Sequence, residues 1–203
     1  DDGDKQNHNK SMLSILEIQK AIQELNDSDP IMKEDPLKVR MGLNSGDVIL
    51  CDIGAAKARV DLTMIGDAVN IAARLETACS QYFIDNLVSD SIAKDAQDQF
   101  SMRIIDRIKV YGKETPVAVY EIINEVGNTS QKENDLIKHF EKGFEAYTQG
   151  KFSAGLKHFQ KSRPLEIDRG YPSSPSDVYI SRCKMLENSP PDNWDGTWIL
   201  ESK

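Results

Sequence analysis

The chain has 203 residues, of which 39% are hydrophobic, and a formal net charge of −8 at pH 7. This length and composition fit one globular domain with an appendage, and no apolar run reaches the roughly 20 residues that a membrane-spanning helix needs. The acidic balance argues against surfaces for nucleic acid or anionic membranes. We therefore expect no nucleic-acid partner and no direct membrane contact from this chain.

The first nine residues are predicted to form a polar loop. Because the chain has no initiator Met, we expect it to start in mid-protein or after processing. Apolar residues then recur at helical spacing and predict an amphipathic helix over residues 9–25. Residues 26–36 contain two Pro and four acidic residues, which predicts a loop.

Alternating apolar residues predict strands over 37–43 and 48–53, joined by a hairpin turn at residues 44–47. A second turn at 54–58 leads to a third predicted strand over 59–65. Gly66 and Asp67 then open a helix that runs to Cys79, and Asp67 is placed to cap it.

Further along, the pattern predicts a strand over 87–89, a helix over 90–96, and strands over 102–110 and 116–123 joined by a hairpin at 111–115. Helices that alternate with a mostly antiparallel sheet predict an α+β fold, with its helices on one face. This domain is predicted to span residues 1–124.

Residues 125–134 are predicted to form a linker, and residues 135–203 a helical extension. Apolar stripes predict helices over 136–147 and 152–159, broken at Gly150, and a third helix over 176–187. Trp194 and Trp198 stand in a tail without periodicity, and we expect them to dock because exposed Trp side chains reduce solubility.

The cysteines Cys51, Cys79 and Cys183 are odd in number and lack the spacing of metal ligands, which favours reduced thiols in a cytoplasmic location. The three histidines are isolated as well. We therefore predict no metal ligand within this chain.

Asn70 and Arg74 stand four residues apart in the predicted helix, so they share one helix face. An amide and a guanidinium on one face suit the ribose and phosphates of a nucleotide. From spacing alone, a surface helix with a solvated Arg remains the alternative.

Three motifs carry a resemblance to a known family. They read Met41-Gly-Leu-Asn-Ser-Gly46, Thr63-Met-Ile-Gly-Asp-Ala-Val-Asn70 and Ala72-Ala-Arg-Leu-Glu76. In this order and spacing they resemble the second half of a class III nucleotidyl cyclase catalytic domain, and the resemblance covers roughly residues 5–122. It implies a ferredoxin-like cyclase domain, present here in part.

The resemblance implies an adenylate cyclase, in which the ribose 3′-hydroxyl of ATP attacks the α-phosphate and releases pyrophosphate. In this family Asn70 would orient the ribose and Arg74 would stabilise charge on the α-phosphate. Thr63 falls at the purine-selecting position with Met64 beside it, and Lys113 is the stand-in for a phosphate-binding Lys. Two Asp upstream of this chain would hold Mg²⁺ or Mn²⁺, and the site would form across a homodimer.

The chain departs from the family pattern in two places. Tyr111 stands where many members have the phosphate-binding Lys, and Cys51-Asp52 replaces the usual Gly-Asn. Thr63 also has a purely structural explanation, because Thr is common in strands.

Small and aromatic residues from Gly143 to Phe159 resemble a tetratricopeptide helical hairpin, for which we expect a protein partner. The Trp-Asp-Gly tail resembles the C-terminal extension of some bacterial cyclases. The alternative function is a non-catalytic dimerisation or scaffold protein, in which a cyclase fold carries a helical partner-binding module.

Overall fold

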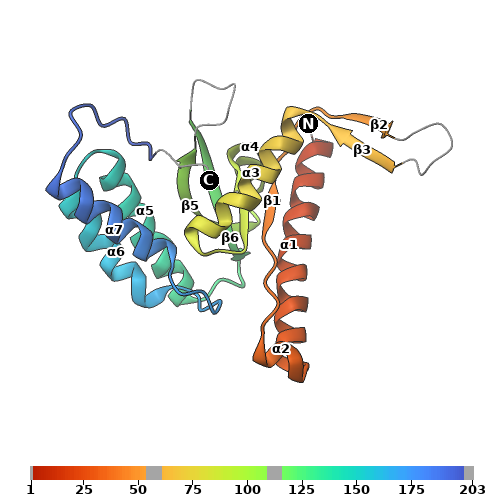
Figure 1. The fold of residues 1–203 in the computed structure, drawn as a ribbon, viewed down its shortest axis with the longest axis horizontal. Coiled ribbons are helices and arrows are strands. Elements are labelled where there is room, and N and C mark those ends of the chain that lie inside the picture. Colours follow the sequence, from red (N-terminus) through yellow and green to blue (C-terminus); the bar gives the residue numbers. More distant parts are fainter. Residues whose placement is uncertain (1, 54–60, 109–115, 199–203) are drawn as a thin grey trace.

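The computed structural model describes residues 2–53, 61–108 and 116–198 (Figure 1). Its elements form an α+β core followed by a helical extension. In chain order they are α1 (Asp2–Ser28), α2 (Pro30–Glu34), β1 (Met41–Leu43), β2 (Ile49–Ile53), β3 (Asp61–Ile65), α3 (Asp67–Tyr82), β4 (Asn86–Ser89), α4 (Asp90–Ala96), β5 (Phe100–Ile108), β6 (Val117–Glu125), α5 (Gln131–Thr148), α6 (Phe152–Ser162), a 3₁₀ turn (Arg163–Leu165) and α7 (Pro175–Asn188).

The main sheet has four strands in the order β1-β4-β6-β5. The β1–β4 pair is parallel, and the β4–β6 and β5–β6 pairs are antiparallel. The strands β2 and β3 form a separate antiparallel hairpin, so the predicted hairpin between residues 37–43 and 48–53 is wrong. The turn instead packs on the start of α3, where Asn44 Nδ2 donates a hydrogen bond of 3.1 Å to the Ala68 carbonyl.

Helices cover both faces of this sheet, not one face as predicted. On one face, α3 and the C-terminal helices pack around Leu87, Ile105 and Val119. On the other face, α1 and α4 pack around Val88 and Ile122. Because successive strand residues point to opposite faces, the neighbours Leu87 and Val88 each enter a different core. Strand β4 is therefore buried on both sides and lacks the alternation of a half-exposed strand.

Helix α1 begins at Asp2, so the predicted N-terminal polar loop is wrong. A tertiary contact supports the added turns, because His8 Nδ1 lies 2.8 Å from Asp95 Oδ2 of α4. The predicted loop over 26–36 also contains a helix, α2. Its start follows local rules, since the Asp29 carboxylate accepts from two backbone N–H groups and Pro30 occupies the first helical position.

The other elements confirm the predictions to within a few residues. These are the predicted strands near 59–65, 87–89, 102–110 and 116–123, and the helices near 67–79, 90–96, 136–147, 152–159 and 176–187. The predicted strand over 37–43 shortens to β1. The predicted turn at 54–58 and the hairpin at 111–115 lie outside the described residues, as do residues 59–60 and 109–110 of two predicted strands.

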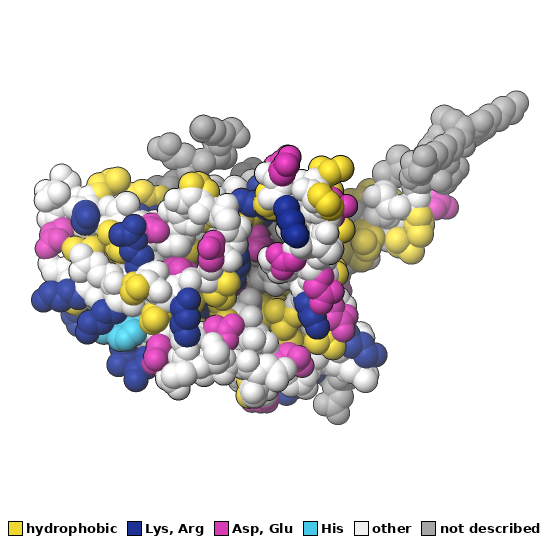
Figure 2. Space-filling model, turned by 90° about the horizontal axis from the view of Figure 1, so that it is seen from below, with side chains coloured by type: hydrophobic (Ala, Val, Ile, Leu, Met, Phe, Trp, Pro, Cys, Tyr) yellow, Lys and Arg dark blue, Asp and Glu magenta, His cyan; other side chains and the backbone are white. Residues whose placement is uncertain are grey.

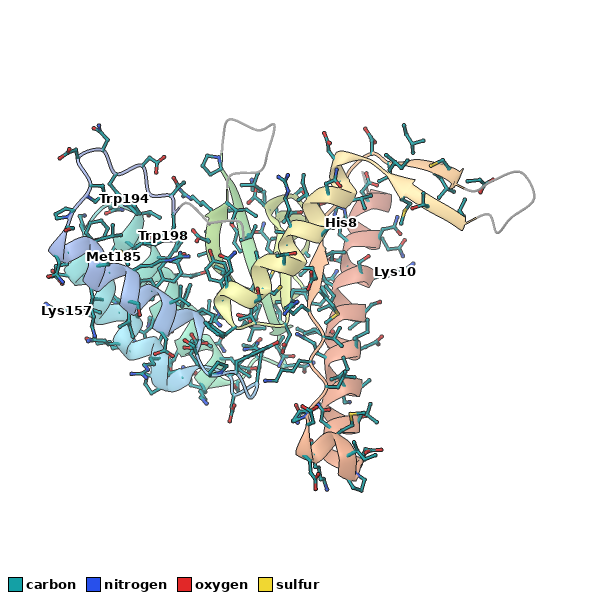
Figure 3. All side chains as sticks on the ribbon, viewed as in Figure 1. His8, Lys10, Lys157, Met185, Trp194 and Trp198 are labelled. Carbon is teal, nitrogen blue, oxygen red and sulfur yellow. The ribbon has the colours of Figure 1, made fainter. Side chains whose placement is uncertain are left out.

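Local contacts define the start of the helical extension, and tertiary contacts hold its C-terminal tail. Helix α5 starts with a capping box, in which Ser130 and Glu133 each accept a backbone hydrogen bond from the other. Gly150, with φ of +73°, reverses the chain between α5 and α6. In the tail, Trp194 Nε1 donates to the Tyr147 carbonyl at 2.9 Å, and Trp198 packs against the same core (Figure 3). The predicted docking of both Trp is confirmed.

All three cysteines are free thiols, and two of them are buried. Over the described residues 2–53, 61–108 and 116–198, none of the helices combines the length and apolar character that a bilayer crossing requires.

Candidate active site

One exposed face of α3 brings two predicted site residues together. Asn70 and Arg74 are both exposed there, while Leu75 and Cys79 of the opposite face are buried in the core. Burial raises the pKa of the Cys79 thiol, so this cysteine is an inert core residue. The amide and the guanidinium are therefore presented outward from a helix whose other face is fixed.

The position of α3 depends on a close approach to β1. A Cβ atom at Gly42 would lie 2.1 Å from the Ala72 carbonyl oxygen and 2.5 Å from the Glu76 backbone nitrogen. Only glycine permits this distance, because both neighbouring atoms belong to the helix backbone. The contact involves the α3 backbone on either side of Arg74 in the sequence, so β1 fixes the part of the helix that carries this side chain.

The start of α3 differs from its prediction. Gly66 is the N-cap, no side chain caps the helix, and Asp67 is the first helical residue. A carboxylate in the first turn still interacts favourably with the helix dipole. Gly66 also allows a second close approach, because a Cβ atom there would lie 2.8 Å from the Asp47 carbonyl oxygen.

Thr63 and Met64 lie on the β2–β3 hairpin, which projects from the core as an arm (Figure 1). In its register Thr63 is opposite Cys51 and Met64 is opposite Leu50. Successive strand residues point to opposite faces, so Thr63 and Met64 face different sides of the arm. A ligand bound on one side of the arm can therefore contact the side chain of Thr63 or that of Met64, but not both.

Apolar side chains dominate the surface of this arm. Ile49 is 70% exposed and Leu62 65% exposed, and Val48, Leu50, Met64 and Ile65 are also largely exposed. Figure 2 shows hydrophobic side chains gathered where the arm leaves the core. An exposed apolar surface of this kind is typical of a protein–protein contact.

Two further predictions concern phosphate and metal binding. Lys113 lies outside the described residues, so the structure does not place it. Within the described parts of the chain, no three His, Cys, Asp or Glu side chains converge in a way that would hold a metal ion. The described residues therefore do not fit a divalent metal.

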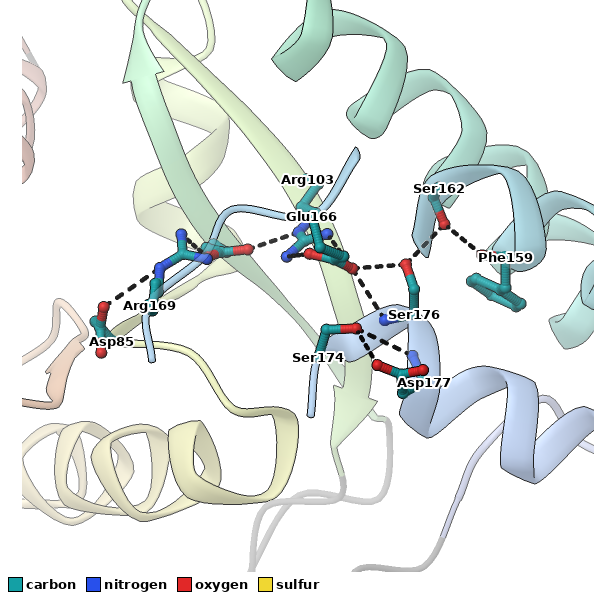
Figure 4. Close-up of polar contacts among 10 residues, drawn as sticks. Asp85, Arg103, Phe159, Ser162, Glu166, Arg169, Ser174, Ser176 and Asp177 are labelled. Atoms are coloured by element: carbon teal, nitrogen blue, oxygen red, sulfur yellow. Dashed lines mark hydrogen bonds and ion pairs between the residues drawn. The ribbon is translucent and has the colours of Figure 1, made fainter. Parts of the chain in front are cut away.

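Sequence reasoning missed a chain of buried charges between the sheet and the extension (Figure 4). Arg103 on β5 is fully buried and pairs with Glu121 at 2.6 Å and Glu166 at 2.9 Å. Arg169 continues the chain to Glu121 at 2.5 Å and to Asp85 at 3.3 Å. One sequence signal could have indicated this chain of charges. Arg103 and Glu121 each stand between apolar neighbours in a predicted strand, and a charged side chain faces a core only when it is paired with an opposite charge.

A second buried cluster joins α3, β5 and α7. Tyr82 ends α3 and donates a hydrogen bond to Asp106 of β5, and Arg182 of α7 donates to the same carboxylate at 2.8 Å. Burial and the Asp106 charge raise the pKa of Tyr82, so its hydroxyl stays protonated and remains a donor. The helix that carries Asn70 and Arg74 is thus bonded to the extension.

The fold and the site together define an α+β domain that presents an Asn–Arg pair on one helix, beside a projecting apolar hairpin. Comparison with known proteins identifies the family. The adenylate and guanylate cyclase catalytic domain model matches residues 3–124, and the chain belongs to this family.

Two adenylate cyclases illustrate the relationship. The enzyme of Anabaena cylindrica is 31% identical over 129 residues, which cover 60% of this chain and 25% of that protein. The terminal-differentiation-specific adenylate cyclase of Dictyostelium discoideum is 28% identical over 150 residues, covering 70% of this chain and 7% of that protein. The chain thus spans a quarter or less of the length of these relatives.

Among solved structures, the crystal structure of the adenylyl cyclase CyaB from P. aeruginosa is 28% identical, with a TM-score of 0.45 over 54% of this chain and 55% of that chain.

Proposed function

We propose that this chain supplies the transition-state half of an adenylate cyclase site, which converts ATP to cyclic AMP and pyrophosphate. The observation that carries the proposal is the exposed face of α3, where Asn70 and Arg74 stand one turn apart above a buried helix face. Membership of the family and the adenylate cyclase relatives support this reaction.

In the proposed reaction, the ribose 3′-hydroxyl loses its proton and its oxygen forms a bond to the α-phosphorus, while the bond from that phosphorus to the bridging oxygen breaks. Pyrophosphate leaves with that electron pair and takes up the proton. Such transfers depend mainly on positioning and on charge stabilisation. Arg74 is always charged, and it would pair with the α-phosphate oxygens as negative charge builds on them. The Asn70 amide can both donate to and accept from ribose hydroxyls, which suits it to hold the sugar.

We infer that the metal half of the site comes from outside this chain. A divalent metal bound there would supply positive charge that offsets the phosphate charge during the transfer. The ligands for Mg²⁺ or Mn²⁺ are expected in residues that precede Asp1 in a longer protein, brought to Asn70 and Arg74 by a second copy of the chain. The exposed apolar β2–β3 arm supports such a homodimer, because its side chains would be buried against a partner.

The decisive test is Arg74→Ala in a protein extended upstream of Asp1. If the guanidinium acts only as charge develops, kcat should fall by roughly 10²–10³, the usual effect of removing one transition-state donor. KM for ATP should change little, because that interaction adds nothing to ground-state binding. Steady-state cyclic AMP formation at several ATP concentrations measures both constants.

Arg40→Ala is a matched control. Arg40 pairs with Glu76 of α3 at 2.8 Å. This variant therefore removes a cation beside α3 and leaves Asn70 and Arg74 unchanged. Surface ion pairs contribute only about 0–1 kcal/mol, and the control should keep wild-type kcat. Wild-type kcat in Arg74→Ala would contradict the enzymatic role and leave a dimerisation or scaffold function.

We further propose that Thr63 favours ATP over GTP. A hydroxyl can accept a hydrogen bond from the adenine amino group, and the half-buried Thr63 lies close to the end of β3, just before α3. Turnover of the two nucleotides by the extended protein tests this. Equal kcat/KM for ATP and GTP would contradict the assignment.

The tetratricopeptide-like character of α5 and α6 also remains a proposal. It is supported by close packing at two glycines, since a Cβ atom at Gly143 would lie 2.9 Å from the Phe159 ring and one at Gly155 would lie 3.1 Å from the Gly143 carbonyl oxygen. Small residues at such crossings allow two helices to approach closely. A protein partner for the extension is expected on the same basis.

A further inference from the structure

We propose that Tyr82, Asp106 and Arg182 are positioning residues, through which the C-terminal helices hold α3 and its side chains Asn70 and Arg74 in their catalytic position. The catalytic part of this inference rests on the proposed function. The coupling between the extension and α3 rests on geometry alone.

The three side chains form a triad that is closed to solvent. Arg182 Nη1 donates to Asp106 Oδ2 at 2.8 Å, and Arg182 Nη2 donates to the Tyr82 oxygen at 3.4 Å. Tyr82 donates to the same Asp106 oxygen. Tyr82 and Asp106 are fully buried and Arg182 is only 6% exposed. Loss of one member therefore leaves a buried polar group without its partner, which the structure can relieve only by shifting.

The triad sits at one end of the helix that carries the proposed catalytic pair. Tyr82 is the last residue of α3. Arg74 and Asn70 lie about 12 Å and about 18 Å from it along the helix axis, at roughly 1.5 Å per residue. Because a helix is a rigid element, a displacement or tilt at Tyr82 is transmitted to both side chains. Gly42 fixes the middle of the helix, and the triad fixes its end.

A bulge in β5 directs the central carboxylate. The register between β5 and β6 shifts between Ile104 and Asp106, and such irregularities re-aim side chains. Next to it, the Ile105 carbonyl accepts a hydrogen bond of 2.7 Å from the Tyr179 hydroxyl of α7. Helix α7 therefore holds β5 at two adjacent residues.

Aromatic rings from α3 and from the extension surround the guanidinium. The Arg182 guanidinium carbon lies 5.3 Å from the ring centroid of Tyr82, 5.0 Å from that of Tyr179 and 4.9 Å from that of Trp198. At these distances the rings make cation–π contacts that orient the guanidinium, and the contact with Trp198 connects the C-terminal tail to the triad. Segments far apart in the sequence thus meet at one arginine.

Stability alone is a weak reason for this arrangement. A buried ion pair often contributes no more to stability than apolar residues of the same volume. Its directional hydrogen bonds, however, allow only one relative placement of α3, β5 and α7. We therefore assign the triad to positioning.

A double-mutant cycle in a protein extended upstream of Asp1 tests the catalytic part. Arg182→Met should lower kcat by roughly 10- to 100-fold with KM for ATP nearly unchanged, because misplacement by about 1 Å can cost on the order of 10²-fold. In the Arg74→Ala background the same change should cost less than about 3-fold, since the main group that it positions is gone. An equal loss in both backgrounds would overturn the positioning role.

Two further variants separate positioning from general destabilisation. Tyr82→Phe removes one hydroxyl and keeps the ring in the core, so it should fold and show the same change in kcat on a smaller scale. Arg163→Met is the matched control, because Arg163 belongs to the same extension but is 63% exposed in its 2.6 Å pair with Asp177. The control should keep wild-type kcat, and a loss equal to that of Arg182→Met would overturn the assignment to the triad.

Hydrogen exchange on the 203-residue chain tests the coupling without any activity. Arg182→Met should speed amide exchange in the second half of α3, whereas Arg163→Met should not. Unchanged exchange in α3 would overturn the coupling even where Arg74 is catalytic. Conversely, wild-type kcat in Arg74→Ala would remove the proposed function while the exchange result still decides whether the extension holds α3.

Discussion

Gly42→Ala should be among the most damaging small substitutions in this chain. The added Cβ would lie 2.1 Å from the Ala72 carbonyl oxygen, 2.5 Å from the Glu76 nitrogen and 3.0 Å from the Leu75 Cβ. The first two atoms belong to the α3 backbone, so the methyl group fits only if the whole helix moves. Overpacking of a core costs about 1–3 kcal/mol, and we expect the upper end here. In a protein of this size, about 3 kcal/mol lowers Tm by about 6–12 °C.

Thermal and urea unfolding of the 203-residue chain, followed by far-UV circular dichroism, measure this loss. Gly3→Ala is the control, because the residue is helical and, apart from its chain neighbours and its own helix backbone, no atom of the described residues lies within 4 Å of a Cβ at Gly3. Alanine is a better helix former than glycine, so the control should be neutral or stabilised by up to about 1 kcal/mol. A Gly42→Ala unfolding curve that superimposes on the wild type would refute the close-packing argument.

Three further predictions concern pH, the extension and activity. Burial alone would raise the pKa of Glu166, but Arg103 and Ser176 lower this pKa below the ordinary value of 4.5. The ionised Glu166 therefore contributes its full stabilisation to the folded state above pH 4.5. This contribution is lost as the pH falls through the lower pKa of the folded state. Urea unfolding across this range should show a flatter pH dependence for Glu166→Gln. Deletion of residues 132–203 should lower Tm and alter sedimentation, because it exposes the buried Arg103 and Asp106. An unchanged Tm would show that the extension does not contribute to the stability of the preceding domain. The chain alone, given ATP and Mn²⁺, should form no cyclic AMP, and robust product would refute the half-site proposal.

Local sequence signals predicted most elements but not their partners. The strand–turn–helix over β3 and α3 was predictable because its periodicity and its Gly66 turn are both local. The sequence predicts a hairpin turn at residues 44–47, but this turn packs on the start of α3 through the hydrogen bond from Asn44 to Ala68. Turn residues specify a change of direction and leave the pairing of the following strand to tertiary contacts.

The candidate site was predictable to a similar extent. Asn70 and Arg74 followed from helical spacing and from the family resemblance, and the structure places both on the exposed face of α3. The close approach at Gly42 was hidden, because glycine in a strand has several explanations until its neighbours are known. The Tyr82–Asp106–Arg182 triad was equally hidden, since three polar residues far apart in the sequence leave no common pattern.

The projecting β2–β3 arm also determines how the chain behaves in concentrated solution. Its two strands pair with each other, and the described residues place no third strand against either outer edge. A ribbon with free backbone edges and exposed Ile49 and Leu62 is a template for strand addition by any neighbouring chain. Aggregation should therefore begin at this ribbon. Charged substitutions at its exposed apolar positions, which lie on both faces of the ribbon, should raise solubility before any other region of the surface needs to be changed.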